Sequence, residues 1–295
     1  FVDLMVKFTV VGGDASSDLA KRIARRLKAP YVKTERKVFP DGESKITINH
    51  IPKKSIVVVV QSTYPPVDTN LLELLSIVSK VQKFSSKIYT VIPYMGYARQ
   101  DREFLDGEII TIGVVGKLLK ASGVKKVLTV DIHSKLALKE LKISSENVSA
   151  MEGLVKYFKK MKMKDPLVVS PDLGGQERAK EFASLLKTGF IALKKHRDRK
   201  TGKVNILSEK VVVKNRDLII VDDMISTGGS IIKATQFLKR QKCKRVFVAC
   251  THALLVNNAA KKIKSAGVSQ IISSNTIPGD SAKVDVSKVI SDALK

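Results

Sequence analysis

Sulfur and aromatic side chains are scarce in this sequence. Two of its 295 residues are cysteines, none is tryptophan, and aromatic residues make up 5% of the chain. Two cysteines cannot build a disulfide framework, and the spacing of Cys243 and Cys250 matches no metal-binding motif. The sequence therefore predicts an aliphatic core and a protein of the reducing cytoplasm.

Long apolar runs are also missing. No stretch approaches the roughly 20 apolar residues that cross a bilayer as a helix, so we expect no membrane partner. The Gly-Lys-Ser/Thr loop of P-loop kinases does not occur either, which argues against an ordinary kinase of that class.

Acidic residues are outnumbered by basic ones. The chain has 53 Lys and Arg against 28 Asp and Glu, which gives a formal net charge of +25. This charge has three interpretations: nucleic-acid binding, anionic small-molecule ligands, or a lysine-rich solvated surface with ion-pair networks. The basic residues recur along predicted helices, as in 21–26 and 159–162, and form no single arm. We therefore favour the solvated surface and expect no nucleic-acid partner.

Short apolar runs alternate with longer amphipathic segments along the chain. The runs have the length and composition of strands covered on both faces of a parallel sheet. The predicted strands are 8–11, 56–60, 88–92, 127–130, 167–169, 190–193, 218–221, 246–249 and 270–272. The predicted helices are 17–27, 71–81, 110–121, 152–161, 176–186, 230–239 and 254–265.

This alternation is typical of an α/β fold with helices on both faces of each sheet. The pattern occurs twice, so we expect two domains, at residues 1–150 and 151–295, with the last helix able to pack back on the first domain. The polar stretch 144–147 precedes a new helix and is interpreted as part of the connection.

The polar motifs fall where the predicted strands end, which is where open α/β sheets bind ligands. The clearest motif follows the run 218–221, with two carboxylates, a turn rich in hydroxyls and glycine, and a helix. Backbone N–H groups in such a turn bind anions, and carboxylates can accept hydrogen bonds from sugar hydroxyls or hold a metal. The sequence therefore predicts a sugar-phosphate site at Asp222, Asp223, Ser226, Thr227, Gly228, Gly229 and Ser230.

Other strand ends carry weaker signals. Arg99 follows the run 88–92 and could bind phosphate or stack on a purine. Asp172 precedes two glycines and a helix, a second candidate anion turn. His133 follows the run 127–130, where a lone histidine is more often structural. The charged segment 194–202 has the features of a solvated hairpin tip.

Several of these segments together resemble a known family. The segment 221–230 resembles the PRPP loop of type I phosphoribosyltransferases. With 39–43, 93–102, 131–133, 170–175 and 250–252, in order over nearly the whole chain, it resembles the ribose-phosphate pyrophosphokinase (PRPP synthetase) family. Phosphoribosyltransferases that only consume PRPP lack the Tyr-Ala-Arg-Gln-Asp run at 97–101.

The resemblance implies a fold, a reaction and a partner. Two phosphoribosyltransferase-type domains are expected, the first binding ATP and the second ribose 5-phosphate. The reaction is the transfer of the β,γ-diphosphoryl group of ATP to the 1-hydroxyl of ribose 5-phosphate, giving PRPP and AMP. In relatives the loop corresponding to 39–43 comes from a neighbouring subunit. The resemblance therefore implies a homodimer or larger homo-oligomer with the ATP site at its interface.

The resemblance also assigns individual residues. ATP would contact Phe39, Asp41, Gly42, Glu43, Arg99, Gln100 and Asp101. Ribose 5-phosphate would contact Arg197 and the residues of the 222–230 turn given above. The pyrophosphate loop would be Asp172, Leu173, Gly174 and Gly175. His133 and Asp172 would help to hold Mg²⁺. Lys195 and Arg197 would be catalytic, with Lys194 the alternative to Lys195 if the register differs by one.

Three hypotheses therefore stay open on sequence alone. The first is the PRPP-forming enzyme, and the second is a transferase that consumes PRPP. The third is a non-catalytic relative or a basic nucleic-acid binder. The presence of Lys195, Arg197, His133 and Asp172 argues against a non-catalytic relative.

Overall fold

The structure is a computed structural model that describes residues 8–49, 55–197, 204–206 and 211–295, with the backbone alone for 195–197 and 204–206. The chain forms two compact units. Unit 1 comprises Phe1–Ser149, Thr276–Pro278 and Val286–Lys295, and unit 2 comprises Ala150–Asn275 and Gly279–Asp285. The end of the chain thus belongs to unit 1. None of the helices in the described residues is long and apolar enough to cross a membrane.

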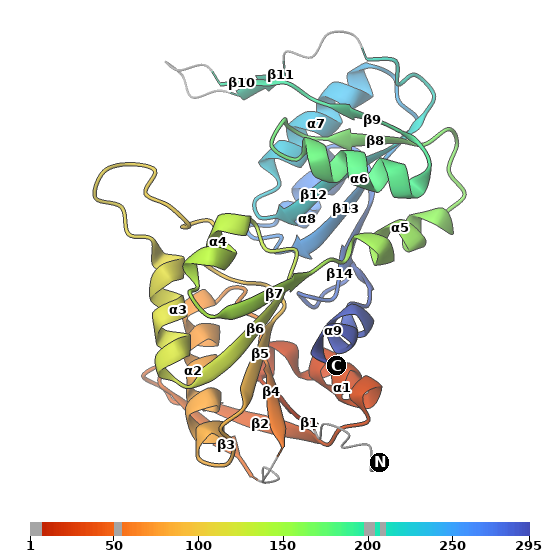
Figure 1. Ribbon diagram of the computed structural model, residues 1–295. Helices are drawn as coiled ribbons and strands as arrows, with labels where there is room; N and C mark the ends of the chain where they lie inside the picture. Colours follow the sequence, from red (N-terminus) through yellow and green to blue (C-terminus); the bar gives the residue numbers. More distant parts are fainter. Residues whose placement is uncertain (1–7, 50–54, 198–203, 207–210) are drawn as a thin grey trace. The chain divides into compact units, whose positions relative to one another are not determined.

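Unit 1 is built, in its described residues, on a seven-stranded sheet with the order β3-β2-β1-β4-β5-β6-β7 (Figure 1). Neighbouring strands are parallel except β2 and β3, which are antiparallel. The strands are β1 (Phe8–Gly12), β2 (Tyr31–Val38), β3 (Ser44–Ile48), β4 (Ile56–Val60), β5 (Ile88–Ile92), β6 (Val124–Val130) and β7 (Ser144–Val148).

Helices cover both faces of this sheet. They are α1 (Ser17–Leu27), α2 (Val67–Gln82), α3 (Thr111–Ala121), α4 (Lys135–Glu140) and α9 (Ser287–Leu294), with a short 3₁₀ helix, η1 (Asp14–Ser16). Helices α2 and α3 lie on one face and α1 and α9 on the other (Figure 1). Arg26 of α1 donates a hydrogen bond of 2.7 Å to Ser287 of α9. Aliphatic side chains such as Val57, Leu74 and Leu119 fill the space between α2, α3 and the sheet.

Unit 2 has, in its described residues, a six-stranded parallel sheet with the order β15-β14-β13-β12-β8-β9. The strands are β8 (Leu167–Ser170), β9 (Gly189–Ala192), β12 (Asp217–Ile225), β13 (Arg245–Ala253), β14 (Val268–Ser274) and β15 (Ala282–Val284). A separate antiparallel pair consists of β10 (Lys195–Arg197) and β11 (Val204–Ile206). The helices are α5 (Met151–Lys159), α6 (Gln176–Leu186), α7 (Gly229–Arg240) and α8 (Ala259–Ser265).

Three phenylalanine rings pack together in the core of unit 2. Phe158 of α5 lies edge-on to Phe182 of α6, with ring centroids 5.8 Å apart, and to Phe247 of β13 at 6.4 Å. A mainly aliphatic cluster packs under α7 and α8, with Ile231 and Ile263 among its buried members. The core is therefore largely aliphatic, as the composition predicts.

The predicted α/β fold class is confirmed, and each of the nine predicted apolar runs forms a strand. The polar stretch 144–147 is not only a connection, because it forms the edge strand β7 of the first sheet. Strands β2 and β3 were not predicted either. They lie at the opposite edge, where charged side chains can face solvent, so they lack a continuous apolar run.

Candidate active site

The predicted sugar-phosphate site comprises the end of β12, the turn that follows it and the start of α7. Strand β12 continues to Ile225, so Asp222 and Asp223 lie within the strand rather than after it, still paired with β13. Gly228 follows with φ +77°, and α7 begins at Gly229. The carboxylates are therefore held by a paired strand, while the turn and the helix start supply backbone N–H groups.

Gly228 is required by its backbone and by its surroundings. Its φ lies in the left-handed region, which favours glycine. A Cβ at this position would also lie 2.7 Å from Cδ1 and 2.9 Å from Cγ1 of Ile263 in α8. A Cβ at the neighbouring Gly229 would have no heavy atom within 4 Å. Helix α8 therefore packs directly behind the turn and fixes its path.

The two carboxylates of the strand have different surroundings. Asp223 is 5% exposed, and its Oδ1 lies 3.6 Å from Nη1 of Arg178 in α6. Desolvation and the neighbouring Asp223 raise the pKa of Asp222 well above its ordinary value. Arg178 is absent from the predicted site, because no spacing in the sequence connects it with a carboxylate so far along the chain.

The predicted pyrophosphate loop connects β8 to α6. The Ser170 hydroxyl donates a 2.6 Å hydrogen bond to the Asp172 carbonyl, and the Gly175 N–H donates one of 3.2 Å to Asp172 Oδ1. Leu173 and Gly174 are exposed at the tip. This loop is thus a tight turn, closed by its own aspartate, that exposes backbone before a helix N-terminus.

The two turns of unit 2 lie at neighbouring strand ends. Strand β8 pairs with β12 on one side and with β9 on the other, so the connections from β8 and from β12 run away from each other. Such a reversal of strand order leaves a crevice at the carboxyl ends, where α/β proteins bind ligands. The structure therefore brings the Asp172 turn and the Asp222 strand to the same edge of one sheet.

In unit 1, the loop after β5 carries Arg99 and Gln100. The loop is held by the end of β4: Gly96 N–H donates a 2.7 Å hydrogen bond to Thr63 Oγ1. A Cβ on Gly96 would lie 2.9 Å from the Thr63 carbonyl oxygen, so only glycine fits there without movement. The Tyr97 hydroxyl donates to Asp68 at the start of α2. These contacts fix the loop while Arg99 and Gln100 stay exposed.

Asp101 differs from its two neighbours, because its side chain is 3% exposed. Its carboxylate accepts hydrogen bonds from the Ser134 hydroxyl and from Arg102, whose Nε and Nη2 lie 3.1 and 3.2 Å away. The Arg102 hydrogen bonds hold the pKa of Asp101 below its ordinary value. The side chain is thus bonded to the protein itself, whereas the sequence interpretation gives it a nucleotide contact.

His133 is exposed in the loop after β6, the strand next to β5. The loop is anchored on both sides of the histidine. The Ile132 N–H donates a 2.8 Å hydrogen bond to the Asn147 side chain in β7, and Ser134 is the N-cap of α4. The structure therefore brings His133 and the Arg99 loop to adjacent strand ends.

The predicted ATP loop at 39–43 is the tip of the β2–β3 hairpin. Phe39 and Glu43 are linked by a 2.8 Å backbone hydrogen bond, and Gly42 has φ +94°. Phe39, Asp41, Gly42 and Glu43 are all exposed. In the sheet, β1 and β4 separate β2 from β5, a distance of about 14 Å at the usual strand spacing. Within unit 1 the hairpin tip and the Arg99 loop therefore come from well-separated strands.

The predicted catalytic residues Lys195 and Arg197 lie on β10, opposite Ile206 and Val204 of β11. Their side chains are outside the described part of the structure, so their predicted roles stay predictions. Lys194, the alternative, is exposed just before the strand.

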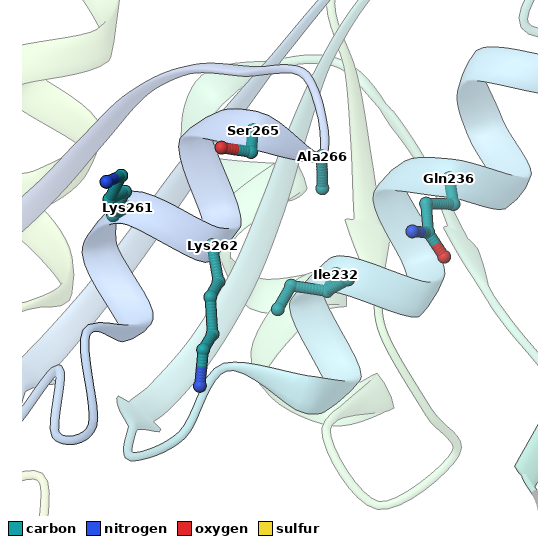
Figure 2. Close-up of a pocket in the computed structure, with 6 residues that line it drawn as sticks. All are labelled: Ile232, Gln236, Lys261, Lys262, Ser265 and Ala266. Atoms are coloured by element: carbon teal, nitrogen blue, oxygen red, sulfur yellow. The ribbon is translucent and has the colours of Figure 1, made fainter.

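A surface pocket of about 460 Å³ lies between α7 and α8 (Figure 2). Its lining residues are Ile232, Gln236, Lys261, Lys262, Ser265 and Ala266, none of which belongs to the predicted site. The Gly228 turn also lies next to α7 and α8, but no residue of the turn lines the pocket.

Comparisons with known proteins cover both units. Residues 8–123 match the family model described as the N-terminal domain of ribose phosphate pyrophosphokinase, and residues 145–286 match the phosphoribosyl transferase domain. The ribose-phosphate pyrophosphokinase of Methanobrevibacter smithii is 36% identical, over 97% of this chain and 99% of that protein. That of Sulfurisphaera tokodaii is 37% identical, over 94% and 96% respectively.

A solved structure gives the same result. The phosphoribosylpyrophosphate synthetase from Mycobacterium smegmatis superposes with a TM-score of 0.85 and 26% identity, over 98% of this chain and 97% of that one. The chain therefore belongs to the ribose-phosphate pyrophosphokinase family, and the family and the function predicted from its sequence are confirmed.

Proposed function

We propose that unit 2 binds ribose 5-phosphate and unit 1 binds ATP in this transfer. The 1-hydroxyl oxygen of the sugar attacks the β-phosphorus of ATP. The bond between that phosphorus and the oxygen bridging to the α-phosphorus breaks, AMP leaves, and the hydroxyl proton is released. Because phosphoryl transfer requires little covalent catalysis by the protein, the protein contributes mainly by positioning the substrates and stabilising charge.

The observation that carries the proposal is that two candidate anion-binding turns follow the neighbouring strands β8 and β12. The turn at 226–230 offers hydroxyls and N–H groups for the 5-phosphate, while Asp222 and Asp223 accept hydrogen bonds from the ribose hydroxyls. The Asp172 turn, at the same sheet edge, offers backbone N–H groups to the transferred diphosphate. A sugar phosphate and a diphosphate are thus accommodated on one unit.

The ATP half is supported by the exposed loop after β5. Arg99 can stack on the purine or meet a phosphate, and Gln100 can hydrogen-bond the base edge. Lys195 and Arg197 then stabilise the negative charge that develops during transfer. Lys194 remains the alternative to Lys195.

Mg²⁺ is the metal that we propose for the nucleotide phosphates. The described residues contain no group of three or more His, Cys, Asp or Glu side chains that could hold a resident metal. This fits Mg²⁺, which proteins commonly hold by one or two carboxylates together with the substrate phosphates and water. As the resemblance implies, His133 and Asp172 would help to hold the ion. When bound, the metal neutralises phosphate charge.

The position of the 39–43 hairpin supports a shared ATP site. Its exposed Phe39, Asp41 and Glu43 lie far along the sheet from the Arg99 loop of the same unit, so a second subunit is the simpler source of a hairpin for that loop. We therefore propose a homodimer or larger homo-oligomer. The two free cysteines are both buried, and they fit our assignment to the reducing cytoplasm.

A product assay tests the reaction. Purified protein with ATP, Mg²⁺ and ribose 5-phosphate should give equal amounts of AMP and PRPP. Omitting ribose 5-phosphate should abolish AMP formation. Release of ADP in place of AMP would contradict the diphosphoryl transfer.

Complementation tests the shared site. Phe39→Ala and Arg99→Ala each damage one half of the ATP site, so each homo-oligomer should have little activity. Mixing the two after dissociation and reassembly should restore activity, because some interfaces then combine an intact hairpin with an intact loop. Absence of restoration, with mixed oligomers demonstrated, would contradict sharing.

A further inference from the structure

Asp101 connects the loop after β5, to which it belongs, with the loop after β6. It directly follows Gln100, yet its side chain is 3% exposed while Arg99 and Gln100 are exposed. Its carboxylate accepts hydrogen bonds from Arg102 and from the Ser134 hydroxyl. A carboxylate placed to contact a nucleotide would need open access, whereas this one is turned into the protein.

Ser134 is the partner of Asp101 in a hydrogen bond that we call the link. Its hydroxyl oxygen accepts a 3.0 Å hydrogen bond from the Ala137 N–H at the start of α4, and its O–H donates a hydrogen bond to the Asp101 carboxylate. The same side chain therefore caps a helix and binds the carboxylate. Because Ser134 is covalently bonded to His133, the position of that histidine depends on both interactions.

The Asp101–Ser134 hydrogen bond connects the loops that follow two neighbouring strands. Arg99 and Gln100 follow β5, whereas His133 and Ser134 follow β6, and the two strands are parallel neighbours. The Asp101–Ser134 hydrogen bond crosses from one loop to the other beyond the last strand pair. Being buried at the carboxylate, it is protected from competition by water, so it can hold the loops at one separation.

We propose that Asp101 is a positioning residue, which does not contact ATP but sets the distance between the Arg99 loop and His133 through Ser134. This inference rests on the proposed binding of the nucleotide at Arg99 and of its metal at His133. A bound nucleotide would need both loops at once, so loss of the link weakens binding of the Mg–ATP complex even though no contact atom is removed.

The experiment uses Ser134→Ala, Asp101→Asn and the double variant in the full-length protein. Each single variant should raise the KM for Mg–ATP about tenfold and leave the KM for ribose 5-phosphate within twofold. The double variant should be no worse than the poorer single variant, because Asp101→Asn weakens the same hydrogen bond that Ser134→Ala removes. Ser134→Thr keeps the hydroxyl and should restore nearly normal KM.

The matched control is Asp217→Asn. Asp217 is also a buried aspartate held by an arginine, Arg245, but it lies in unit 2 at the start of β12, the opposite end of that strand from Asp222. This variant should lower the melting temperature without changing the KM for Mg–ATP. If Ser134→Ala and Asp101→Asn behave like the control, with a lower melting temperature and an unchanged KM, the positioning role is overturned.

Two other outcomes also decide the matter. If Asp101→Asn raises the KM for Mg–ATP and Ser134→Ala does not, then Asp101 contacts the nucleotide directly and the inference fails. The variants Arg99→Ala and His133→Ala distinguish failure of the positioning role from failure of the proposed ATP site. If these two variants raise the KM for Mg–ATP while Ser134→Ala does not, the ATP site stands and only the positioning role of Asp101 is overturned. If they too leave the KM unchanged, the ATP site and the inference fall together.

Discussion

Arg178 in α6 places its Nη1 atom 3.6 Å from Oδ1 of Asp223 in β12. This ion pair joins the helix that follows the Asp172 turn to the strand that carries the two acceptor carboxylates. The two turns of unit 2 are therefore connected by side chains as well as by the sheet. A change at Arg178 should alter the binding of the sugar rather than that of ATP.

We expect Arg178→Met to raise the KM for ribose 5-phosphate about fivefold, because a partly exposed ion pair contributes about 1 kcal/mol. The KM for Mg–ATP should stay the same. Arg216→Met is the control, since its arginine is similarly exposed and it removes an ion pair in the same unit, to the more exposed Asp165. Steady-state kinetics with each substrate varied would check this, and equal effects of the two variants would contradict it.

Gly228→Ala should destabilise the free protein, because the new Cβ meets Ile263 and the backbone has φ +77°. The left-handed conformation alone costs about 1–2 kcal/mol for a residue other than glycine. The melting temperature without ligand should fall by about 2–8 °C. Gly229→Ala should have little effect on it, because a Cβ there meets no atom within 4 Å. Equal melting temperatures for the two variants would show that α8 does not constrain the turn.

Lys195→Ala should slow turnover far more than it weakens the binding of ribose 5-phosphate. Removing one group that stabilises developing charge typically costs about 10²–10³ in kcat. Single-turnover rates and binding of the sugar phosphate measured separately would test this. Lys194→Ala is the comparison, and a larger loss of kcat there would give the catalytic role to Lys194. Near-normal turnover in Lys195→Ala would remove the role from that residue.

The Asp217–Arg245 pair should make stability depend on pH in the acid range. Hydrogen bonds from Arg245 lower the pKa of Asp217 below its ordinary value of about 3.9. Because the folded state binds this proton more weakly than the unfolded state, the pair stabilises the fold above about pH 4. That stabilisation is lost as the pH falls through the lowered pKa.

Asp217→Asn should therefore cost about 1–3 kcal/mol in the free energy of unfolding at pH 7. The difference from the unchanged protein should shrink below about pH 4. Urea unfolding at a series of pH values would measure it. A difference that stays constant down to the acid transition would show that the charge of Asp217 is not the cause.

The sheets could be predicted because their central strands are covered on both faces. Burial on two sides demands continuous aliphatic runs, such as 56–60 and 218–221, and these are visible in the sequence. Strands at the edge of a sheet, or next to the edge, have no such demand. Strands β2, β3 and β7 therefore carry charged and polar side chains and could not be told from loops.

The residues of the candidate site likewise differ in whether a local sequence pattern reveals them. The segment 222–230 is a local feature, since its carboxylates, hydroxyls and glycines lie within nine successive residues, so the sequence alone identified it and the family that it resembles. Arg178 and Ser134 are different. Their partners lie 45 and 33 positions away along the chain, and no local pattern links them.

The amino-acid sequence by itself determined the alternation of strand and helix, the anion-binding turns and the family. These properties follow from backbone chemistry and from burial over a few consecutive residues. Only the tertiary structure decided that Asp222 and Asp223 lie within a strand, that α8 blocks a side chain at Gly228, and that Asp101 is turned into the protein toward Ser134. Each of these depends on atoms brought together from distant parts of the chain, where packing rather than local sequence sets the distances.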